Sequence, residues 1–377
     1  MRVESFTSTN GLTRYILVDS SGVPIDAVLK FLRFKDNCGR ARNTLRAYCF
    51  HLKSYFEYLE SIGMTFSQIG MDELAGFIRW LQGNHGQEKI LSFPPAAVSK
   101  CSASTINVYL STIYTFYDYL SRHEEYRLRL SDKLTCTILG SRRGFKDFLY
   151  HVNRTKRYDT RIIKLKEPKK RIKMLKKSEV ERILSACLTT RDRFLIQLLW
   201  ESGMRIGEAL ALWLEDVEPD AHRIHIVDRG ELANLSEIKT VCSPRTVDVS
   251  ADLINLFFEY IVEAHTDDVD TNHVFIKLSG PHKHSPLEYG DVSALVRRLQ
   301  KRTGFHFTVH MLRHSSLSEL RRLGWPVEQL RIRAGHHFVQ STYVYLHTDD
   351  EELRQEWIRT ENQMLLRKGG TKNESGV

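Results

Sequence analysis

The spacing of apolar residues predicts a mostly helical chain. Between residues 26 and 60 apolar side chains recur at intervals of three and four, as one face of a helix requires; they are Leu29, Leu32, Tyr48, Leu52, Tyr55, Phe56 and Leu59. Residues 69–81 and 104–120 follow the same period. Residues 84–97 contain a glycine and two prolines and predict a loop between these helices.

A second patterned region begins after residue 173. Ser178 followed by Glu181 has the form of a capping box, so we expect Ser178 to cap a helix. Helical patterns continue to about residue 213. Segments 223–227 and 245–249 alternate between apolar and polar residues, which is typical of two strands joined by a polar turn. Helical patterns then resume toward the C-terminus.

These patterns predict a mainly α fold with a small antiparallel β-sheet, divided into domains. Residues 1–25 form an N-terminal extension with a short strand at 15–18. Residues 26–138 form a compact helical domain, 139–172 a linker, and 173–377 a second domain. The 377 residues are 42% hydrophobic, which is enough for real cores and excludes a wholly disordered chain.

The composition also indicates in which cellular compartment the protein is expected. No apolar run approaches the roughly 18 residues of a membrane helix, and the first residues lack the apolar stretch of a secretory signal. The six cysteines are scattered without a C-x-x-C pair, which favours reduced thiols over disulfides or zinc. We therefore expect a cytoplasmic protein without membrane partners.

Charge is concentrated in one segment. The net charge is +9, yet residues 141–177 alone carry fifteen basic and three acidic side chains, so the rest of the chain is slightly acidic. Such a basic belt favours a polyanion through counterion release, with DNA as the first candidate. A solvated linker is the alternative. The belt residues expected at DNA are Arg142, Arg143, Arg154, Lys156, Arg157, Lys169, Lys170 and Arg171.

The strongest group of candidate catalytic residues lies in residues 307–316. Thr308 can cap a helix that stops at Gly324, and His310 and Arg313 leave its first turn three residues apart. A helix N-terminus attracts anions, and an added arginine and histidine make a phosphate site. Elsewhere, Arg205 lies in Ser-Gly-Met-Arg-Ile-Gly-Glu, and Tyr345 follows Gly335-His336 by ten residues from the glycine. Each fragment alone is weak, because a single histidine or arginine is more often structural.

Taken in order, the fragments resemble the tyrosine recombinase (phage integrase) family. The set is Arg205, a lysine between two strands, His310-x-x-Arg313, Gly335-His336 and Tyr345. The resemblance covers roughly residues 25–365. It implies that residues 26–138 are a SAM-like core-binding domain, whose helix openings at 44–48 and 104–107 match and whose Thr44 and Arg46 contact DNA. It also implies that residues 173–377 are the catalytic domain.

Carried over residue by residue, the resemblance implies a division of roles. Arg205 and Arg313 clamp the scissile phosphate, and Glu208 orients the first arginine. His336 hydrogen-bonds the phosphate. These cationic groups take over the Lewis-acid role of a metal, so the resemblance implies neither a metal nor a cofactor.

The proton transfers and the nucleophile follow in the same way. Lys239 protonates the leaving 5′ oxygen, His310 carries a proton, and Tyr345 attacks phosphorus to give a 3′-phosphotyrosine link. Tyr343 is a competing nucleophile that would point from another face of the helix. Ala334 and Ser315 depart mildly from the family's usual leucine and threonine. His310 and His314 have a zinc-ligand spacing, but the Glu of H-E-x-x-H is missing and Arg313 would repel a cation.

The resemblance implies a site-specific recombinase that integrates, excises or transposes a mobile element. Its partner is double-stranded DNA, bound by a homotetramer on paired sites, with a second recombinase or an accessory protein left open. The apolar stripe of residues 351–368 either packs on its own domain or docks on a neighbouring protomer, and the resemblance favours exchange. A type IB topoisomerase, a non-catalytic DNA-binding regulator and a metal-dependent nuclease are the alternatives.

Overall fold

A computed structural model describes most of the chain. The described residues are 1–9, 11–83, 100–123, 125–126, 135–139, 157–161, 163–168, 173–238, 242–343, 354, 357–358 and 360–361. The chain divides into two compact units, Met1–Lys170 and Arg171–Val377, called here the N-terminal and C-terminal units. No helix in the described ranges is long and apolar enough to cross a membrane.

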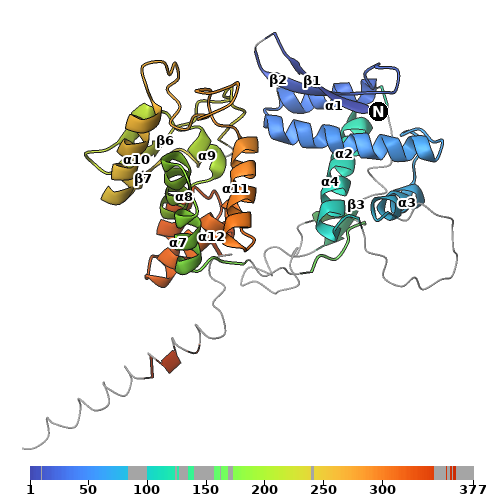
Figure 1. Ribbon diagram of the computed structural model, residues 1–377. Coiled ribbons are helices and arrows are strands. Elements are labelled where there is room, and N and C mark those ends of the chain that lie inside the picture. The colour runs from blue at the N-terminus through green and yellow to red at the C-terminus, as the bar shows by residue number, and fades with distance from the viewer. Residues whose placement is uncertain are drawn as a thin grey trace, which may run out of the picture. The chain divides into compact units, whose positions relative to one another are not determined.

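In the described ranges, the N-terminal unit combines a β-hairpin with the helices α1 to α4 (Figure 1). Strands β1 (Arg2–Thr7) and β2 (Thr13–Val18) pair antiparallel, with Arg2 opposite Val18. The helices are α1 (Asp26–Asn37), α2 (Arg42–Ser61), α3 (Met71–Leu81) and α4 (Ala103–Arg122). The predicted strand at 15–18 is therefore the second half of β2. Strand β1 was missed because its mostly exposed residues show no alternation.

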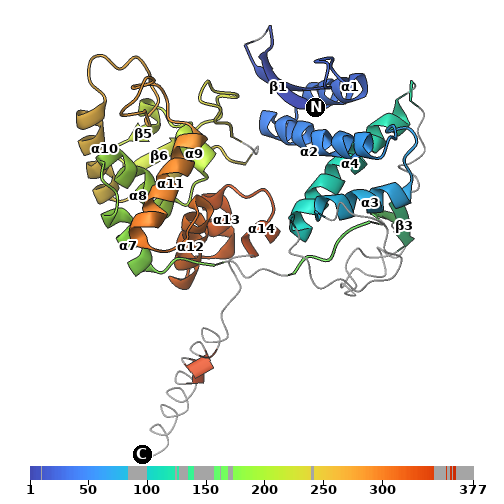
Figure 2. The same ribbon diagram turned by 45° about the vertical axis from the view of Figure 1, so that its right-hand side comes forward.

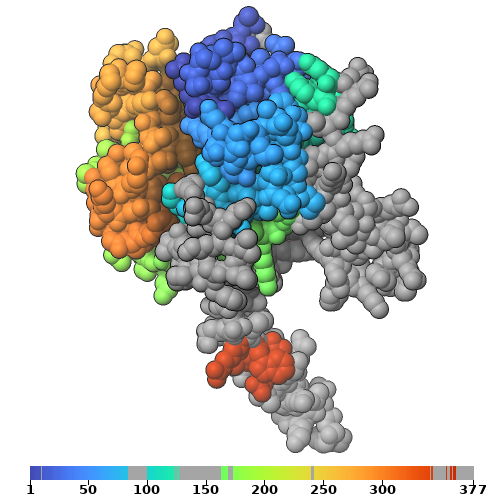
Figure 3. Space-filling view, turned by 90° about the vertical axis from the view of Figure 1, so that its right-hand side faces the viewer, coloured from blue at the N-terminus to red at the C-terminus, as the bar shows by residue number. Residues whose placement is uncertain are grey.

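Aromatic rings fill the core of this unit. Phe31, Tyr55, Phe77 and Phe116 are fully buried, so the three- and four-residue spacing read from the sequence is the inner face of the helices. The Tyr55 and Tyr117 hydroxyls hydrogen-bond at 2.6 Å, which satisfies two buried polar groups. Strand β2 packs along α2, and in the space-filling view the dark-blue hairpin lies directly on the lighter-blue helices (Figure 3).

Part of the predicted linker belongs to the N-terminal unit. Strand β4 (Arg157–Arg161) pairs antiparallel with β3 (Thr135–Leu139), and residues 163–168 then run along α4. The Asn107 amide bonds both the N–H and the carbonyl of Leu165, each at 2.9 Å. The Tyr114 hydroxyl does the same for Ile163 at 3.1 Å. The expectation of a free linker over 139–172 fails here because these apolar residues alternate with the lysines and pack on the core.

The C-terminal unit surrounds a small antiparallel sheet with helices (Figures 1 and 2). The sheet has the order β5 (Val217–Glu218), β6 (Arg223–Ile226) and β7 (Arg245–Asp248), with Ile224 opposite Val247. The helices are α7 (Lys177–Ser185), α8 (Thr190–Ser202), α9 (Ile206–Leu210), the 3-10 turn η1 (Leu214–Asp216), α10 (Ala251–Ala264), α11 (Tyr289–Thr303), α12 (Val309–Arg322), α13 (Val327–Ala334) and α14 (Gln340–Tyr343). The predicted fold class and both predicted strands are confirmed.

The predicted helix starts differ in their outcome. Thr308 caps α12 as expected, because its side chain accepts from the Met311 N–H at 3.2 Å. The predicted cap at Ser178 is wrong. Helix α7 already starts at Lys177, and the Glu179 carboxylate accepts from the Lys176 N–H at 2.8 Å. A glutamate three residues after the cap satisfies the first backbone donors whether or not the cap is a serine.

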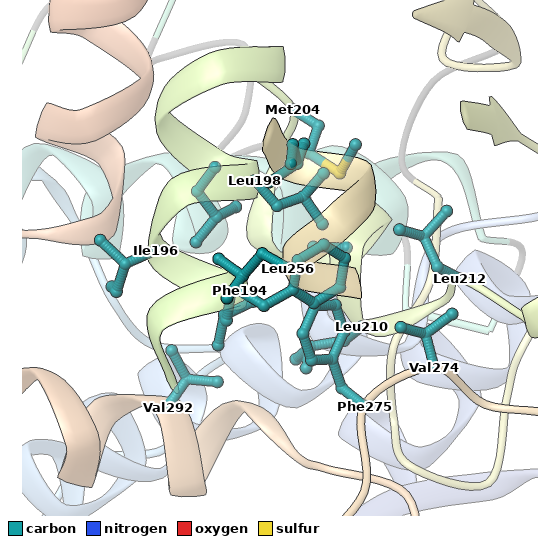
Figure 4. Close-up of a cluster of buried hydrophobic side chains, with 14 of the residues drawn as sticks. Phe194, Ile196, Leu198, Met204, Leu210, Leu212, Leu256, Val274, Phe275 and Val292 are labelled. Carbon is teal, nitrogen blue, oxygen red and sulfur yellow. The ribbon is translucent and has the colours of Figure 1, made fainter. Parts of the chain in front are cut away.

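Helix α8 runs through the middle of the C-terminal core. Phe194 stacks on Phe275 with ring centroids 5.4 Å apart, and Leu198 is fully buried. Figure 4 shows these side chains together with Met204, which precedes the short helix α9, and Leu210, which ends it. Each fully buried side chain of this size contributes about 1.5–3 kcal/mol. The core therefore fixes the end of α8, and Gly203 there turns left-handed at a φ of 64° to start the next segment.

Candidate active site

Arg205 stands at the start of α9 and is held by Glu208. The Arg205 N–H donates to Glu208 Oε2 at 2.8 Å, and its Nη1 donates to Oε1 at 2.8 Å. A further bond joins Arg205 Nη2 to the carbonyl of Gly335 at 3.2 Å. The Arg205 side chain stays 28% exposed, whereas Glu208 is 2% exposed. Glu208 and the carbonyl of Gly335 thus fix the orientation of the guanidinium, and part of the side chain remains exposed.

Glu208 has a second cationic partner that the sequence reasoning missed. Arg245 Nη2 donates to Oε2 at 2.9 Å and Nη1 donates to Oε1 at 3.2 Å. Burial raises the pKa of the carboxyl, but the hydrogen bonds and charges of Arg245 and Arg205 outweigh it and lower the pKa to about 2. Glu208 is a carboxylate at neutral pH. Nothing in the sequence separates Arg245 from Arg223, which starts the neighbouring strand and is exposed.

Arg313 is buried on α12, and its guanidinium lies against the turn that ends α13. Its Nη1 donates to the carbonyl of Gly203 and its Nη2 to the carbonyl of Ala334, each at 2.6 Å. Since Arg205 bonds the next carbonyl, Gly335, one turn at the end of α13 holds both guanidiniums. The structure therefore brings Arg205 and Glu208 together with Arg313, which lies far from both in the sequence. Figure 2 shows α12, α13 and α14 side by side.

His336 is a neutral ring wedged against Arg313. Its Nε2 lies 2.9 Å from Arg313 Nη2, and a guanidinium only donates, so Nε2 is the acceptor. The proton is then on Nδ1, which donates to the Thr342 hydroxyl at 3.0 Å. Burial, followed by the charge of Arg313, lowers the pKa of His336 to about 3. Thr342 is fully buried and anchors α14 to the site.

His310 is exposed on the first turn of α12 and rests on His314. The two ring centroids are 4.2 Å apart and the planes nearly perpendicular. Partial burial and the charges of Arg313 and Arg205 lower the pKa of His310, so the ring is neutral at pH 7. Burial lowers the pKa of His314 to about 4. Within the described ranges no group of three His, Cys, Asp or Glu side chains is placed to hold a metal ion.

The start of the C-terminal unit is tied to α12. The Leu175 N–H donates to the Ser315 hydroxyl at 2.7 Å, and Ser315 donates to the carbonyl of Met311 at 2.7 Å. Leu175 and Ser315 are both buried. The chain therefore enters this unit two residues away from Arg313.

The described part of the segment between β6 and β7 is anchored to the rest of the C-terminal unit. Arg229 donates two bonds to the buried carboxylate of Asp216, at 2.7 and 2.9 Å, and lies 4.3 Å from the Trp213 ring. Asn234 donates to the carbonyls of Leu210 and Leu287 at 2.9 and 3.1 Å. These contacts fix the chain on the way to Lys239, which itself lies outside the described residues.

Several predicted residues are not described by the structure. Tyr345 lies outside the described residues, and Tyr343 is the last residue of α14, with its backbone alone described. Of the predicted belt, only the backbone of Arg157 is described, in β4; outside lie Arg142, Arg143, Arg154, Lys156, Lys169, Lys170 and Arg171.

The two predicted DNA contacts on α2 are described. Thr44 is half-buried and Arg46 exposed, one turn into the helix. The Arg46 guanidinium lies 5.9 Å from the Tyr15 ring and 5.5 Å from the Phe50 ring. The N-terminal hairpin thus supplies one of the two rings that flank this cation.

Two family models match the chain, and both units are covered. Residues 173–352 match the model described as "Phage integrase family", and residues 30–124 match "Phage integrase, N-terminal SAM-like domain". Transposase A from transposon Tn554 of Staphylococcus aureus is 37% identical over 355 residues, which cover 94% of this chain and 95% of that protein. Tyrosine recombinase XerD of Staphylococcus saprophyticus is 22% identical over 88% of this chain and 95% of its own length.

Solved structures share the fold at low identity. The integrase of transposon Tn1549 in complex with a circular intermediate DNA superimposes with a TM-score of 0.57 at 16% identity, covering 89% of this chain and 98% of that one. The XerH recombinase bound to its difH substrate gives 0.56 at 19% identity, covering 84% and 79%. The ordered residues, both family models and the full-length likeness agree, and the chain belongs to the phage integrase family, the tyrosine-type site-specific recombinases.

Proposed function

We propose that this recombinase cleaves and rejoins double-stranded DNA at the ends of a mobile element, through a 3′-phosphotyrosine link on Tyr345. The observation that carries the proposal is the single turn that holds both Arg205 and Arg313 beside a neutral His336. The likeness to a transposase over nearly its whole length supports a role in transposition.

The two arginines have complementary roles toward a phosphodiester. Among the described residues, Arg205 Nε has no hydrogen-bond partner, and its side chain is the more exposed of the pair. Arg205 therefore offers donors to one non-bridging oxygen directly, while the buried Arg313 reaches the phosphate by turning from its present partners. Two guanidiniums neutralise the charge that builds up when a nucleophile attacks an anion. Loss of one such donor typically slows the reaction by about 10²–10³-fold.

Proton transfer accompanies cleavage. A tyrosine with a pKa of about 10 must lose its proton to attack at neutral pH, and His310 is exposed and neutral there, so it can accept that proton. Lys239 protonates the leaving 5′ oxygen. Attack forms the P–O bond to Tyr345 and releases the 5′-hydroxyl, and the reverse attack by a 5′-hydroxyl rejoins the strand.

His336 is the predicted hydrogen-bond donor to the phosphate. In the described geometry its Nε2 accepts from Arg313, so it donates only after the ring switches to the Nε2–H tautomer. The Thr342 hydroxyl permits this switch because it can accept from Nδ1 or donate to it. When Arg313 turns toward a phosphate oxygen, Nε2 is released to follow.

DNA contacts extend over both units. Thr44 and Arg46 on α2 and the eight belt residues named above contact the backbone, which adds salt-dependent affinity. Recombination needs two sites at once, so we propose a homotetramer on paired sites, with an accessory protein left open. Trp357 and Ile358 are 62% and 45% exposed, which supports docking of the C-terminal helix on a neighbouring protomer.

Covalent trapping tests this proposal. The protein is incubated with a nicked duplex that carries the end sequence of its own element, with a chelator present, and the adduct is mapped by mass spectrometry. We expect an adduct on Tyr345 that is lost in Tyr345→Phe and kept in the matched control Tyr343→Phe.

The alternatives give different outcomes in the same assay. An adduct on Tyr343 keeps the reaction and moves the nucleophile. DNA binding without an adduct on either tyrosine supports a non-catalytic regulator. Cleavage that occurs only when the chelator is left out supports a metal-dependent nuclease. Relaxation of a supercoiled plasmid that lacks the end sequence of the element supports a topoisomerase.

A further inference from the structure

Arg245, the first residue of β7, makes more polar contacts than a structural surface arginine needs. Its Nε donates to the carbonyl of Arg333 at 2.7 Å and its Nη1 to the carbonyl of Ser243 at 2.7 Å. Its Nη1 and Nη2 atoms also donate to the two carboxylate oxygens of Glu208. Four of the five N–H groups of the guanidinium are therefore engaged inside the protein.

Arg245 is not itself placed to bind a phosphate. Its side chain is 6% exposed, against 28% for Arg205, and its donors are spent on the carboxylate and two carbonyls. Arg245 acts on the two phosphate-binding arginines through its neighbours instead. Glu208 orients Arg205, and the carbonyl of Arg333 directly precedes the turn that holds Arg205 and Arg313.

Gly335 shows how closely Arg245 approaches this turn. A Cβ on Gly335 would lie 2.6 Å from Arg245 Nη1 and 3.1 Å from the backbone oxygen of Cys242. Gly335 also has a φ of +60°, which side chains rarely adopt. The glycine of the Gly-His pair is thus required by two constraints, and one of them is the Arg245 guanidinium.

We propose that Arg245 is a positioning residue for strand cleavage, which clamps Glu208 and the C-terminal turn of α13 into one unit so that Arg205 and Arg313 meet the same phosphate. This inference rests on the proposed function. It predicts that loss of Arg245 harms the chemical step and leaves DNA affinity intact.

A titration signature follows from the same geometry. Without Arg245, Glu208 keeps its burial but loses the guanidinium that binds both of its oxygens, so its pKa rises. Protonated Glu208 no longer holds Arg205, so cleavage by the variant falls on the acid side of neutrality. Among the described residues, the other charged group facing Glu208 is Arg205 itself.

The experiment compares Arg245→Met with Arg245→Lys, and uses Arg223→Met as the matched control. Arg223 starts the adjacent strand β6 and makes an exposed ion pair with Asp248. Single-turnover adduct formation is measured from pH 5 to pH 8.5 at saturating protein on the nicked duplex used above, and DNA affinity is measured by gel shift. Circular dichroism checks the fold of each variant.

We expect Arg245→Met to form the adduct about 10²-fold more slowly with DNA affinity unchanged, because small misplacements of catalytic groups cost about that much. Its rate should fall toward acid pH more steeply than that of the wild type, in which only His310 takes up a proton. Arg245→Lys should stay slow, since an ammonium cannot span both oxygens of Glu208 and two carbonyls. Arg223→Met should match the wild type.

Three results overturn the inference. They are a wild-type rate in Arg245→Met, a slow rate whose pH profile parallels the wild type, and full recovery in Arg245→Lys, which would mean that charge alone matters. If Arg245→Met does not fold, Arg245→Lys still carries the rate and pH tests. If the wild type forms no adduct at all, the proposed function fails. The pH dependence of unfolding then tests Arg245 alone, through the acid transition of Glu208.

Discussion

Replacing Glu208 by glutamine removes one charge and almost no volume, so it isolates the electrostatic role of this residue. The carboxylate is 2% exposed and faces Arg205 and Arg245. In Glu208→Gln both guanidiniums keep their places but lose the anion between them. Breaking a buried pair in this way leaves uncompensated charge and is strongly destabilising.

The size of the effect follows from the pKa of Glu208. The value falls from 4.5 to about 2 on folding. At 1.36 kcal/mol per pH unit, this corresponds to about 3 kcal/mol of stability at pH 7. Because the folded pKa is the lower one, this contribution is complete above pH 4.5 and is lost as the pH falls toward 2. At pH 3 about 1 kcal/mol remains.

Hydrogen exchange measured by mass spectrometry along a urea series provides the assay. Peptides from α8 and α10 report the C-terminal unit separately from the N-terminal unit. We expect Glu208→Gln to lower the unfolding free energy of these peptides by about 3 kcal/mol at pH 7 and by much less at pH 3. Equal stability of both proteins at pH 7, or a difference that does not change with pH, would refute the reasoning.

Three further predictions concern the same site. Gly335→Ala should destabilise the C-terminal unit beyond Gly304→Ala in thermal unfolding, because both positions have positive φ but a Cβ at Gly304 meets open space; equal losses would contradict this. Thr342→Val should slow adduct formation without weakening DNA binding in gel shifts, because the His336 Nδ1–H loses its acceptor. The pKa values of His314 and His336 fall to about 4 and about 3, so the unfolded chain takes up their protons first as the pH drops below 6.5. Urea titrations of the wild type should therefore show an unfolding free energy that decreases from pH 6.5 to pH 4. An unfolding free energy that stays constant over this range would contradict the conclusion that the His314 and His336 rings are buried and neutral.

Local patterns predicted the elements of this fold well. The helices of the N-terminal unit and the strands at 223–227 and 245–249 follow from period and alternation, because each buries the side that its sequence marks as apolar. Failures occurred where local signals were ambiguous. Lys176 and Ser178 both precede a glutamate by three residues, and the sequence does not say which glutamate reaches back.

Several residues of the candidate site could be named from the sequence, but the contacts between them could not be predicted from it. Arg205, Arg313 and His336 were found as motif residues, and their shared turn at Ala334 and Gly335 appears only in three dimensions. Arg245 gave no signal, because the burial of its side chain depends on Glu208, which is 37 residues away in the sequence. Long-range pairing of this kind is set by packing and leaves no local period.

The hydrogen bond between the Leu175 N–H and the Ser315 hydroxyl provides a path by which mechanical force on the chain before Leu175 reaches α12. Any tension that arrives along the backbone from residues before Leu175 reaches α12 through this bond before it reaches the rest of the C-terminal unit. Ser315 follows Arg313 by two residues and His310 by five on α12, so a pull on the chain acts on the N-terminal half of that helix. Under the proposed function, strain generated when DNA is bent or wrapped would reach the helix that carries His310 and Arg313 by this path.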